Sequence, residues 1–256
     1  MYERKYISAA VSVRGRMWYD KKTERTGKER QEKMEIRDCI LYEDREIIVC
    51  RKPAGVPVQT KQMQTKDMVS LLKNYRFQQE KSGREPYIGV IHRLDQPVEG
   101  ILVYAKTPQA AKELNRQLQT GAFGKHYQAV LCGIPEHEQG NLMNYLVKDG
   151  RTNLSKICKK TEAGAKEARL SYEILKKAEG KALAKIQLDT GRHHQIRVQM
   201  SGIGCPILGD VKYGGEERKR GQIALCAYCL EFFHPKTKKP MQFELQPAAE
   251  GFEAFF

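Results

Sequence analysis

The alternation of apolar and polar residues along the chain predicts strands separated by short amphipathic helices. Apolar residues on both sides of an acidic turn in 40–50 indicate a pair of strands, with the folded domain beginning near residue 36. Apolar positions three and four residues apart predict a helix over 66–79. A second helix is expected from Pro108 to Gly121, with Thr107 as its N-cap.

The second half of the chain reads mainly as strands. The spacing of Ile196, Met200 and Ile203 predicts a third helix, on which His193 and Arg197 share one face. Around this helix we expect a strand over 124–133, short strands or loops over 134–166, a hairpin from 168–177 and 181–190, and a terminal hairpin from 223–233 and 241–245.

The stretch Gly89–Lys106 interrupts this pattern with polar residues at a turn. An apolar run leads into His92-Arg93-Leu94-Asp95, residues 96–100 break it, and a second apolar run follows, which predicts strand, tight connection, strand. The turn therefore presents Arg93 and Asp95 at the end of a buried strand. A nearby guanidinium offsets the cost of keeping a carboxylate charged in a sheltered cleft, so Asp95 is a candidate nucleophile or base. An ordinary surface salt bridge is the alternative.

The charge balance points to a polyanionic partner. Lys and Arg number 45 against 31 Asp and Glu, which gives a formal net charge of +14. Nucleic acid is the favoured partner because neutralised phosphates release condensed counterions. An anionic membrane surface competes, but it requires a basic amphipathic helix that the sequence does not convincingly contain. Residues 1–35 are crowded with charge, and 20–33 contain no apolar residue, so we expect a flexible basic arm before a folded domain over 36–256.

Several other kinds of site are disfavoured by the sequence. Gly202-Ile203-Gly204 lacks the third glycine of a dinucleotide fingerprint because Ile207 stands there, and the sequence has no phosphate-loop motif, so no nucleotide cofactor is expected. Cys226 and Cys229 have metal-ligand spacing but no second pair, which favours core packing over zinc. His193 and His194 would face different ways on a helix, which also disfavours a metal. The charged N-terminus and seven cysteines suggest a cytoplasmic protein with reduced thiols.

Separated blocks of the sequence, in this order, resemble the RluA-type pseudouridine synthases. The resemblance runs from about residue 38 to about 247. The blocks are Val49–Gly55, His92–Asp95 with Gly100–Lys106, Lys125–Ala129, Gly191–Val198, Gly204–Asp210 and Leu225–Pro235.

The resemblance implies a fold, a reaction and a partner. The fold would be α+β, a long mixed and mostly antiparallel sheet with flanking helices and a central RNA-binding cleft. The reaction would isomerise specific uridines in structured ribosomal or transfer RNA to pseudouridine: the base is flipped out, detached from ribose at nitrogen 1, turned, and rejoined through carbon 5. No metal or organic cofactor is implied, and a monomer is the default expectation.

The resemblance also implies roles for individual residues. Asp95 would be the catalytic carboxylate, and Arg197 would pair with it and aim it. Tyr127 would stack on the uracil and is a candidate to take the proton from carbon 5. Arg93 would brace the gap left by the flipped nucleotide. Further RNA contacts are expected from His92, Lys125, Arg192, His193, His194 and Gln195.

The sequence departs from the family pattern at a few positions. Val98-Glu99 stand where a Thr-Ser or similar pair is usual, so Glu99 either brings negative charge toward Asp95 or points away. His193 replaces a Thr or Ser, and Gln199 replaces a His, which changes the expected RNA contacts and leaves Asp95, Tyr127 and Arg197 in place. Two alternatives stay open: an RNA-binding or ribosome-associated protein that has lost the reaction, and, more weakly, a membrane-surface protein.

Overall fold

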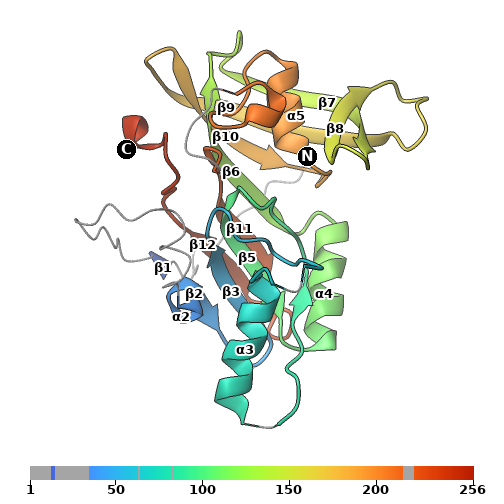
Figure 1. Cartoon of the computed structure of the whole chain (residues 1–256), viewed down its shortest axis with the longest axis vertical. Helices are drawn as coiled ribbons and strands as arrows, with labels where there is room; N and C mark the ends of the chain where they lie inside the picture. Colours follow the sequence, from blue (N-terminus) through green and yellow to red (C-terminus); the bar gives the residue numbers. More distant parts are fainter. Residues whose placement is uncertain (1–12, 15–34, 63, 82, 216–221) are drawn as a thin grey trace.

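A single mixed sheet organises the computed structural model, which describes residues 13–14, 35–62, 64–81, 83–215 and 222–256. Within these residues the sheet has 12 strands, and its main path runs β2-β3-β5-β11-β6-β10-β9-β7-β8 (Figure 1). The strands are β1 Val13–Arg14, β2 Ile40–Glu43, β3 Ile47–Lys52, β4 Gly89–Val90, β5 Glu99–Ala105, β6 Gly124–Cys132, β7 Gln139–Asp149, β8 Leu154–Cys158, β9 Lys166–Ala178, β10 Lys181–Leu188, β11 Leu225–Phe233 and β12 Pro240–Glu244.

Most neighbouring strands run antiparallel. The exceptions among the described pairs are β5 with β11 and β1 with β12, which are parallel. The helical elements are α2 Ile36–Cys39, α3 Met68–Glu80, α4 Pro108–Gln119, α5 Gln195–Gly202, and the 3₁₀ turns η1 Val211–Tyr213 and η2 Glu253–Phe255. The predicted α+β class with a long, mostly antiparallel mixed sheet is confirmed.

Helices cover both faces of the sheet because its central strands are apolar on both sides. In β3, Ile48 and Cys50 join the apolar cluster that includes α3 and α5, whereas Ile47 and Val49 join the cluster that includes α4. This double burial follows from the period of two along a strand. In Figure 1, α3 and α4 lie beside the β3–β5 region, and α5 lies beside β7 and β8.

Helix ends follow the capping residues in the sequence. The Asp67 side chain accepts the Ser70 N–H at the start of α3, and the Thr107 hydroxyl accepts the Ala110 N–H at the start of α4. Pro108 occupies the first turn of α4, where its missing N–H costs nothing. The two predicted helices are therefore confirmed with small shifts at their ends.

Two predictions about the second half of the chain are wrong. Residues 134–166 contain β7, an 11-residue strand, rather than only short strands or loops. Helix α5 begins at Gln195, with His194 before it in a left-handed conformation at φ 55°, so His193 shares no helix face with Arg197. A helix pattern of eight residues is too short to locate its own first turn. The expectation of a flexible arm over 1–35 falls mostly outside the described residues.

Candidate active site

The loop that carries Asp95 joins β4 to β5 and is clamped to the turn after β3. The Gln96 carbonyl accepts the Gly55 N–H at 2.8 Å, and the Gln96 side-chain amide donates back to the Gly55 carbonyl at 3.0 Å. Within the loop, the Val98 N–H donates to the Asp95 carbonyl at 3.0 Å. These bonds fix the backbone on both sides of the Asp95 side chain.

Lys52 also holds the Asp95 loop against the turn after β3. Its side chain is fully buried, and its Nζ donates to the carbonyls of Pro53, Val56 and Gln96 at 2.9, 2.7 and 3.1 Å. Burial lowers the pKa of Lys52 to about 7, although the carboxylates of Asp95 and Glu99 oppose the shift. Three carbonyl acceptors match the three donors of an ammonium, so the protonated form holds the loop most completely.

Arg197 connects the Asp95 loop to α5 and to the segment after it. Its Nε and one terminal nitrogen donate to the two carboxylate oxygens of Asp210 at 2.6 and 2.7 Å, and its other terminal nitrogen donates to Asp95 at 3.3 Å. Burial by itself would lower the pKa of Arg197, but the carboxylates of Asp210 and Asp95 outweigh it, and the pKa is raised. A charged, doubly held guanidinium therefore faces the Asp95 carboxylate.

His194 also lies beside Asp95. The Ser155 N–H donates to the Tyr213 hydroxyl, which in turn lies 2.8 Å from His194 Nδ1. The other ring nitrogen of His194, Nε2, faces Asp95. That nitrogen lies 3.6 Å from an Asp95 oxygen. His194 is the residue before α5, and its backbone is left-handed.

His193 and His194 face each other, contrary to expectation. Their rings stack at a centroid distance of 3.8 Å, because neither residue lies within α5. The Ser155 hydroxyl lies 2.9 Å from His193 Nδ1. Burial, followed by Arg197 and His193, lowers the pKa of His194 to about 3, so this imidazole is neutral at physiological pH.

Tyr127 lies on β6 with its side chain buried. Burial and the neighbouring Asp95 carboxylate raise the pKa of its phenol well above the usual value. The phenol therefore stays protonated and offers an aromatic face and a hydroxyl donor. In this state it is suited to stacking, whereas accepting a proton is disfavoured in the free protein.

All the residues predicted from the sequence line one large cavity. Its volume is about 1050 Å³, and its wall includes Asp95, Tyr127, Arg197, Arg93, His92, Arg192, His193, His194, Gln195 and Lys125. Asp95 is 30% exposed at its side chain, so the carboxylate is reachable from the cavity. Lys148 and Lys212 add further positive charge to the wall.

The predicted RNA contacts differ in how freely they face the cavity. Arg93 and Arg192 are exposed, although Arg192 also donates to the Glu167 carbonyl at 2.8 Å. His92 packs edge-on against Phe123 with ring centroids 5.2 Å apart. Gln195 is 3% exposed. Its side-chain oxygen accepts hydrogen bonds from the Thr190 hydroxyl and the Arg192 N–H, and its side-chain nitrogen donates to the Arg169 carbonyl. The contacts of His92 and Gln195 shape the wall of the cavity.

Glu99 points away from Asp95. Its carboxylate accepts the N–H groups of Ala248 and Ala249 at 2.7 and 2.8 Å and the Arg51 guanidinium at 3.2 Å. The sequence left open which groups the negative charge of Glu99 faces. In the structure it faces two backbone N–H groups and the Arg51 guanidinium. The residue ties the C-terminal segment to the start of β5.

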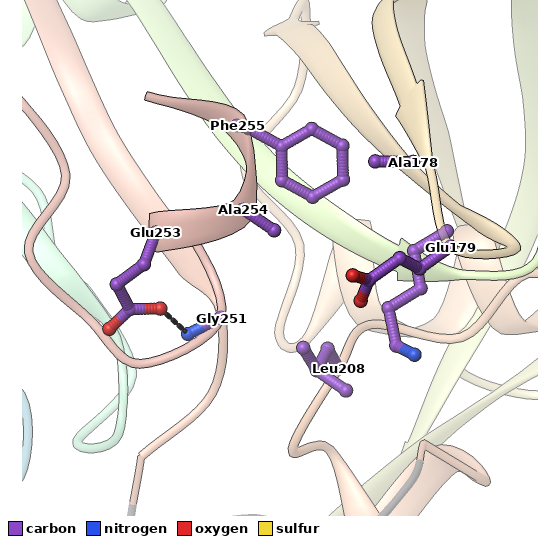
Figure 2. A pocket seen from close by; sticks show the side chains of 8 residues that line it. Ala178, Glu179, Leu208, Gly251, Glu253, Ala254 and Phe255 are labelled. Atoms are coloured by element: carbon purple, nitrogen blue, oxygen red, sulfur yellow. Dashed lines mark hydrogen bonds between the residues drawn. The ribbon is translucent and has the colours of Figure 1, made fainter.

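A smaller cavity of about 220 Å³ lies elsewhere, beside the C-terminal turn η2. Figure 2 shows the Phe255 ring on one wall, Leu208 and Ala178 on the other, and Glu253 bonded to the Gly251 N–H. It contains none of the residues that the sequence predicted. The catalytic candidates therefore all belong to the large cavity.

A family model described as RNA pseudouridylate synthase matches residues 46–202 of the chain, a span that includes Asp95, Tyr127 and Arg197. The chain belongs to the RNA pseudouridylate synthase family. The resemblance found in the sequence is confirmed.

Relatives in this family cover most of the chain. Ribosomal large subunit pseudouridine synthase D of Pseudomonas aeruginosa is 32% identical over 227 residues, which is 83% of this chain and 69% of that protein. An uncharacterized RNA pseudouridine synthase of Bacillus subtilis, YlyB, is 33% identical over 208 residues, 80% of this chain and 67% of that protein.

A solved structure shows the same fold. Human RNA pseudouridylate synthase domain containing 4 aligns with a TM-score of 0.69 at 24% identity and covers 83% of this chain and 90% of that one. Within the described residues, none of the helices has both the length and the apolar character that crossing a bilayer requires.

Four residues at the site were given no role from the sequence: Asp210, Tyr213, Ser155 and Lys52. Asp210 ends the Gly204–Asp210 block and Lys52 lies in the Val49–Gly55 block, so both were marked by the resemblance without being given a role, and Tyr213 follows shortly after Asp210. Ser155 lies in the stretch predicted as short strands or loops. Their roles depend on contacts with α5, which a linear pattern does not report.

Proposed function

We propose that this chain isomerises uridine in structured RNA to pseudouridine, with Asp95 as the essential carboxylate. The observation that carries the proposal is the arrangement around Arg197, which is held by Asp210 and directed at Asp95 inside a basic cavity that also contains Tyr127. A fixed guanidinium orients a carboxylate without reorganisation during the reaction.

The remaining roles follow from position and charge. Tyr127 offers a stacking face to the flipped uracil, and exposed Arg93 occupies the space that the base leaves in the RNA helix. Arg192, Lys125 and Lys148 bind phosphates around the opening. Breaking the bond from ribose to nitrogen 1 and forming one to carbon 5 needs no net oxidant, and no proton is gained or lost overall because carbon 5 releases one to solvent and nitrogen 1 takes one up. Attack on the sugar, attack on the base and removal of a ribose proton all use the same Asp95 carboxylate.

Ribosomal RNA is the first substrate to test, because a relative at 32% identity is named for the large ribosomal subunit. Transfer RNA is the second. We place the enzyme in the cytoplasm as a monomer, where all seven cysteines would stay reduced, as they are free in the structure.

The test uses RNA from cells that lack the gene. Wild-type protein should restore pseudouridine at one or a few uridines in site-resolved mapping, and Asp95→Asn should restore none while RNA affinity changes less than about threefold. Asp189→Asn is the matched control, since Asp189 lines the same cavity away from Arg197, and it should retain turnover within about tenfold.

Two results would contradict the proposal in different ways. Turnover by Asp95→Asn near the wild-type rate removes Asp95 from the chemistry. RNA binding by the wild type without pseudouridine at any site favours the alternative, a binding protein that has lost the reaction.

A further inference from the structure

A group of potential metal ligands lies outside the large cavity, on the outward face of β11 and its neighbours. Along β11, Leu230 and Phe232 point into the apolar cluster around α4. The alternating residues Cys229 and Glu231 point the other way. On β6, His126 likewise alternates with Tyr127, so it faces away from the candidate active site.

Strand register brings these residues together. His126 lies directly opposite Cys229 across β6 and β11, and Cys229 lies opposite Glu244 across β11 and β12. Directly opposite residues point to the same face and have neighbouring Cβ atoms. One row across three strands therefore contains the imidazole of His126, the thiol of Cys229 and the carboxylate of Glu244. Glu231 lies two residues beyond Cys229 on β11 and so points to the same face.

Gly124 creates the space that the group needs. It lies opposite Glu231, and a Cβ at this position would come within 2.8 Å of a Glu231 carboxylate oxygen and 3.2 Å of His126 Nε2. Without that carbon, the Glu231 carboxylate folds back over β6 to lie 3.3 Å from His126 Nε2. The ligand atoms of His126, Cys229 and Glu231 all lie within 4.8 Å of one another.

The local charge favours a cation. Glu231 lies two residues from Cys229 on the same face of β11, and Glu244 lies opposite Cys229 on β12, so two acidic residues flank the thiol. Carboxylates beside a nitrogen and a sulfur ligand attract a positive ion. Among the described residues the buried Nδ1 of His126 has no hydrogen-bond partner, while Nε2 contacts Glu231, so the ring keeps one unsatisfied nitrogen.

We propose that His126, Cys229 and Glu231 bind one divalent transition-metal ion of the Zn²⁺ class, with Glu244 or water at the fourth position. Nitrogen, sulfur and carboxylate oxygen are the ligands that Zn²⁺ takes in proteins. Ligand atoms around a tetrahedral ion are roughly 3.5 Å apart, so the group must contract by about 1 Å. The Glu231 side chain is 48% exposed and can make that movement.

The site would join β6 to β11 on the side opposite Tyr127. It is separate from Asp95 and is not needed for the proposed isomerisation. Its expected effect is on stability, since an ion that binds the folded state alone raises the melting temperature.

The test uses tag-free full-length protein and two probes, Zn²⁺ and Co²⁺. Equilibrium dialysis should give one ion per chain, and Co²⁺ should produce a thiolate-to-metal charge-transfer band in the near ultraviolet. Cys229→Ser should abolish the band, and Glu231→Gln should weaken binding more than about tenfold. Because Glu231 is largely exposed, that second variant is expected to fold normally, and circular dichroism would check both.

Matched controls use the same residue types elsewhere on the chain. Cys158→Ser on β8 and His137→Gln before β7 should leave stoichiometry, band and thermal shift unchanged. The proposal is overturned if the wild type binds neither ion at micromolar concentrations, if the band survives in Cys229→Ser, or if folded Glu231→Gln binds as tightly as the wild type.

Discussion

At the scale of single residues, the carboxylate of Asp210 decides where the guanidinium of Arg197 points. Asp210 is 1% exposed and uses both oxygens on Arg197, which leaves one guanidinium nitrogen to face Asp95. A lone arginine of this length would sample several rotamers. The two-point contact removes that freedom, so Asp210 acts on Asp95 through Arg197.

Asp210→Asn should therefore reduce turnover more than RNA binding. We expect kcat to fall at least about tenfold, because Arg197 loses its orientation, with KM changed much less, since phosphate contacts set RNA affinity. Loss of a buried charge pair should also lower the free energy of unfolding by about 3 kcal/mol, so kinetics are measured well below the unfolding temperature. An unchanged kcat in the folded variant would show that Asp210 has no positioning role.

At the scale of elements, the parallel contact between β5 and β11 depends on one glycine. Gly100 lies opposite Ala227 at φ 141°, and a Cβ there would come within 2.5 Å of the Ala227 side chain and 2.6 Å of its backbone nitrogen. The two strands approach this closely where the Asp95 loop returns to the sheet. Gly100 thus permits both an unusual backbone angle and a close approach.

Gly100→Ala should force these strands apart. We expect the free energy of unfolding, measured by urea denaturation, to fall by about 2 kcal/mol or more, with reduced turnover because the Asp95 loop ends at this junction. Gly150→Ala, in the turn after β7, meets no atom within 4 Å and should change stability little. Equal stability of the two variants would refute the close-packing argument.

At the scale of the whole molecule, buried histidines should set the response to acid. Burial lowers the pKa of His92 and of His194 from 6.5 to about 3, with Lys125 adding to the shift at His92 and Arg197 at His194. Between these values the unfolded chain binds protons that the folded protein does not. The folded state is therefore favoured above pH 6.5 and loses stability as the pH falls toward 3.

Chemical denaturation across this pH range should reveal the effect. Each of the two histidines can contribute a slope of at most about 1.4 kcal/mol per pH unit to the free energy of unfolding. His194→Gln should make the dependence shallower, and His137→Gln, at an exposed position, should not. A slope identical in His194→Gln and the wild type would contradict the burial of a neutral His194.

The fold was predictable wherever local pattern suffices. The apolar runs of 40–50, the alternation in 181–188 and the helix cap Thr107 specify strands and helices through short-range physics. The interruption at 96–100 likewise marked the Asp95 loop, which occupies 91–98 in the structure, and all the predicted site residues line one cavity. Residues 134–166 were harder because β7 is half exposed and its alternation is mixed with turn residues.

The sequence by itself determined most of the strands and helices outside 134–166, and its motif blocks identified the family and the catalytic candidates. Only the tertiary structure decided which distant groups meet: Asp210 and Asp95 at Arg197, the C-terminal amides at Glu99, and Cys229 with His126 rather than with Cys226. The physical reason is that periodicity and capping act over a few residues. Hydrogen bonds and ion pairs form instead across strands and loops, and the topology of the sheet determines which of them become neighbours.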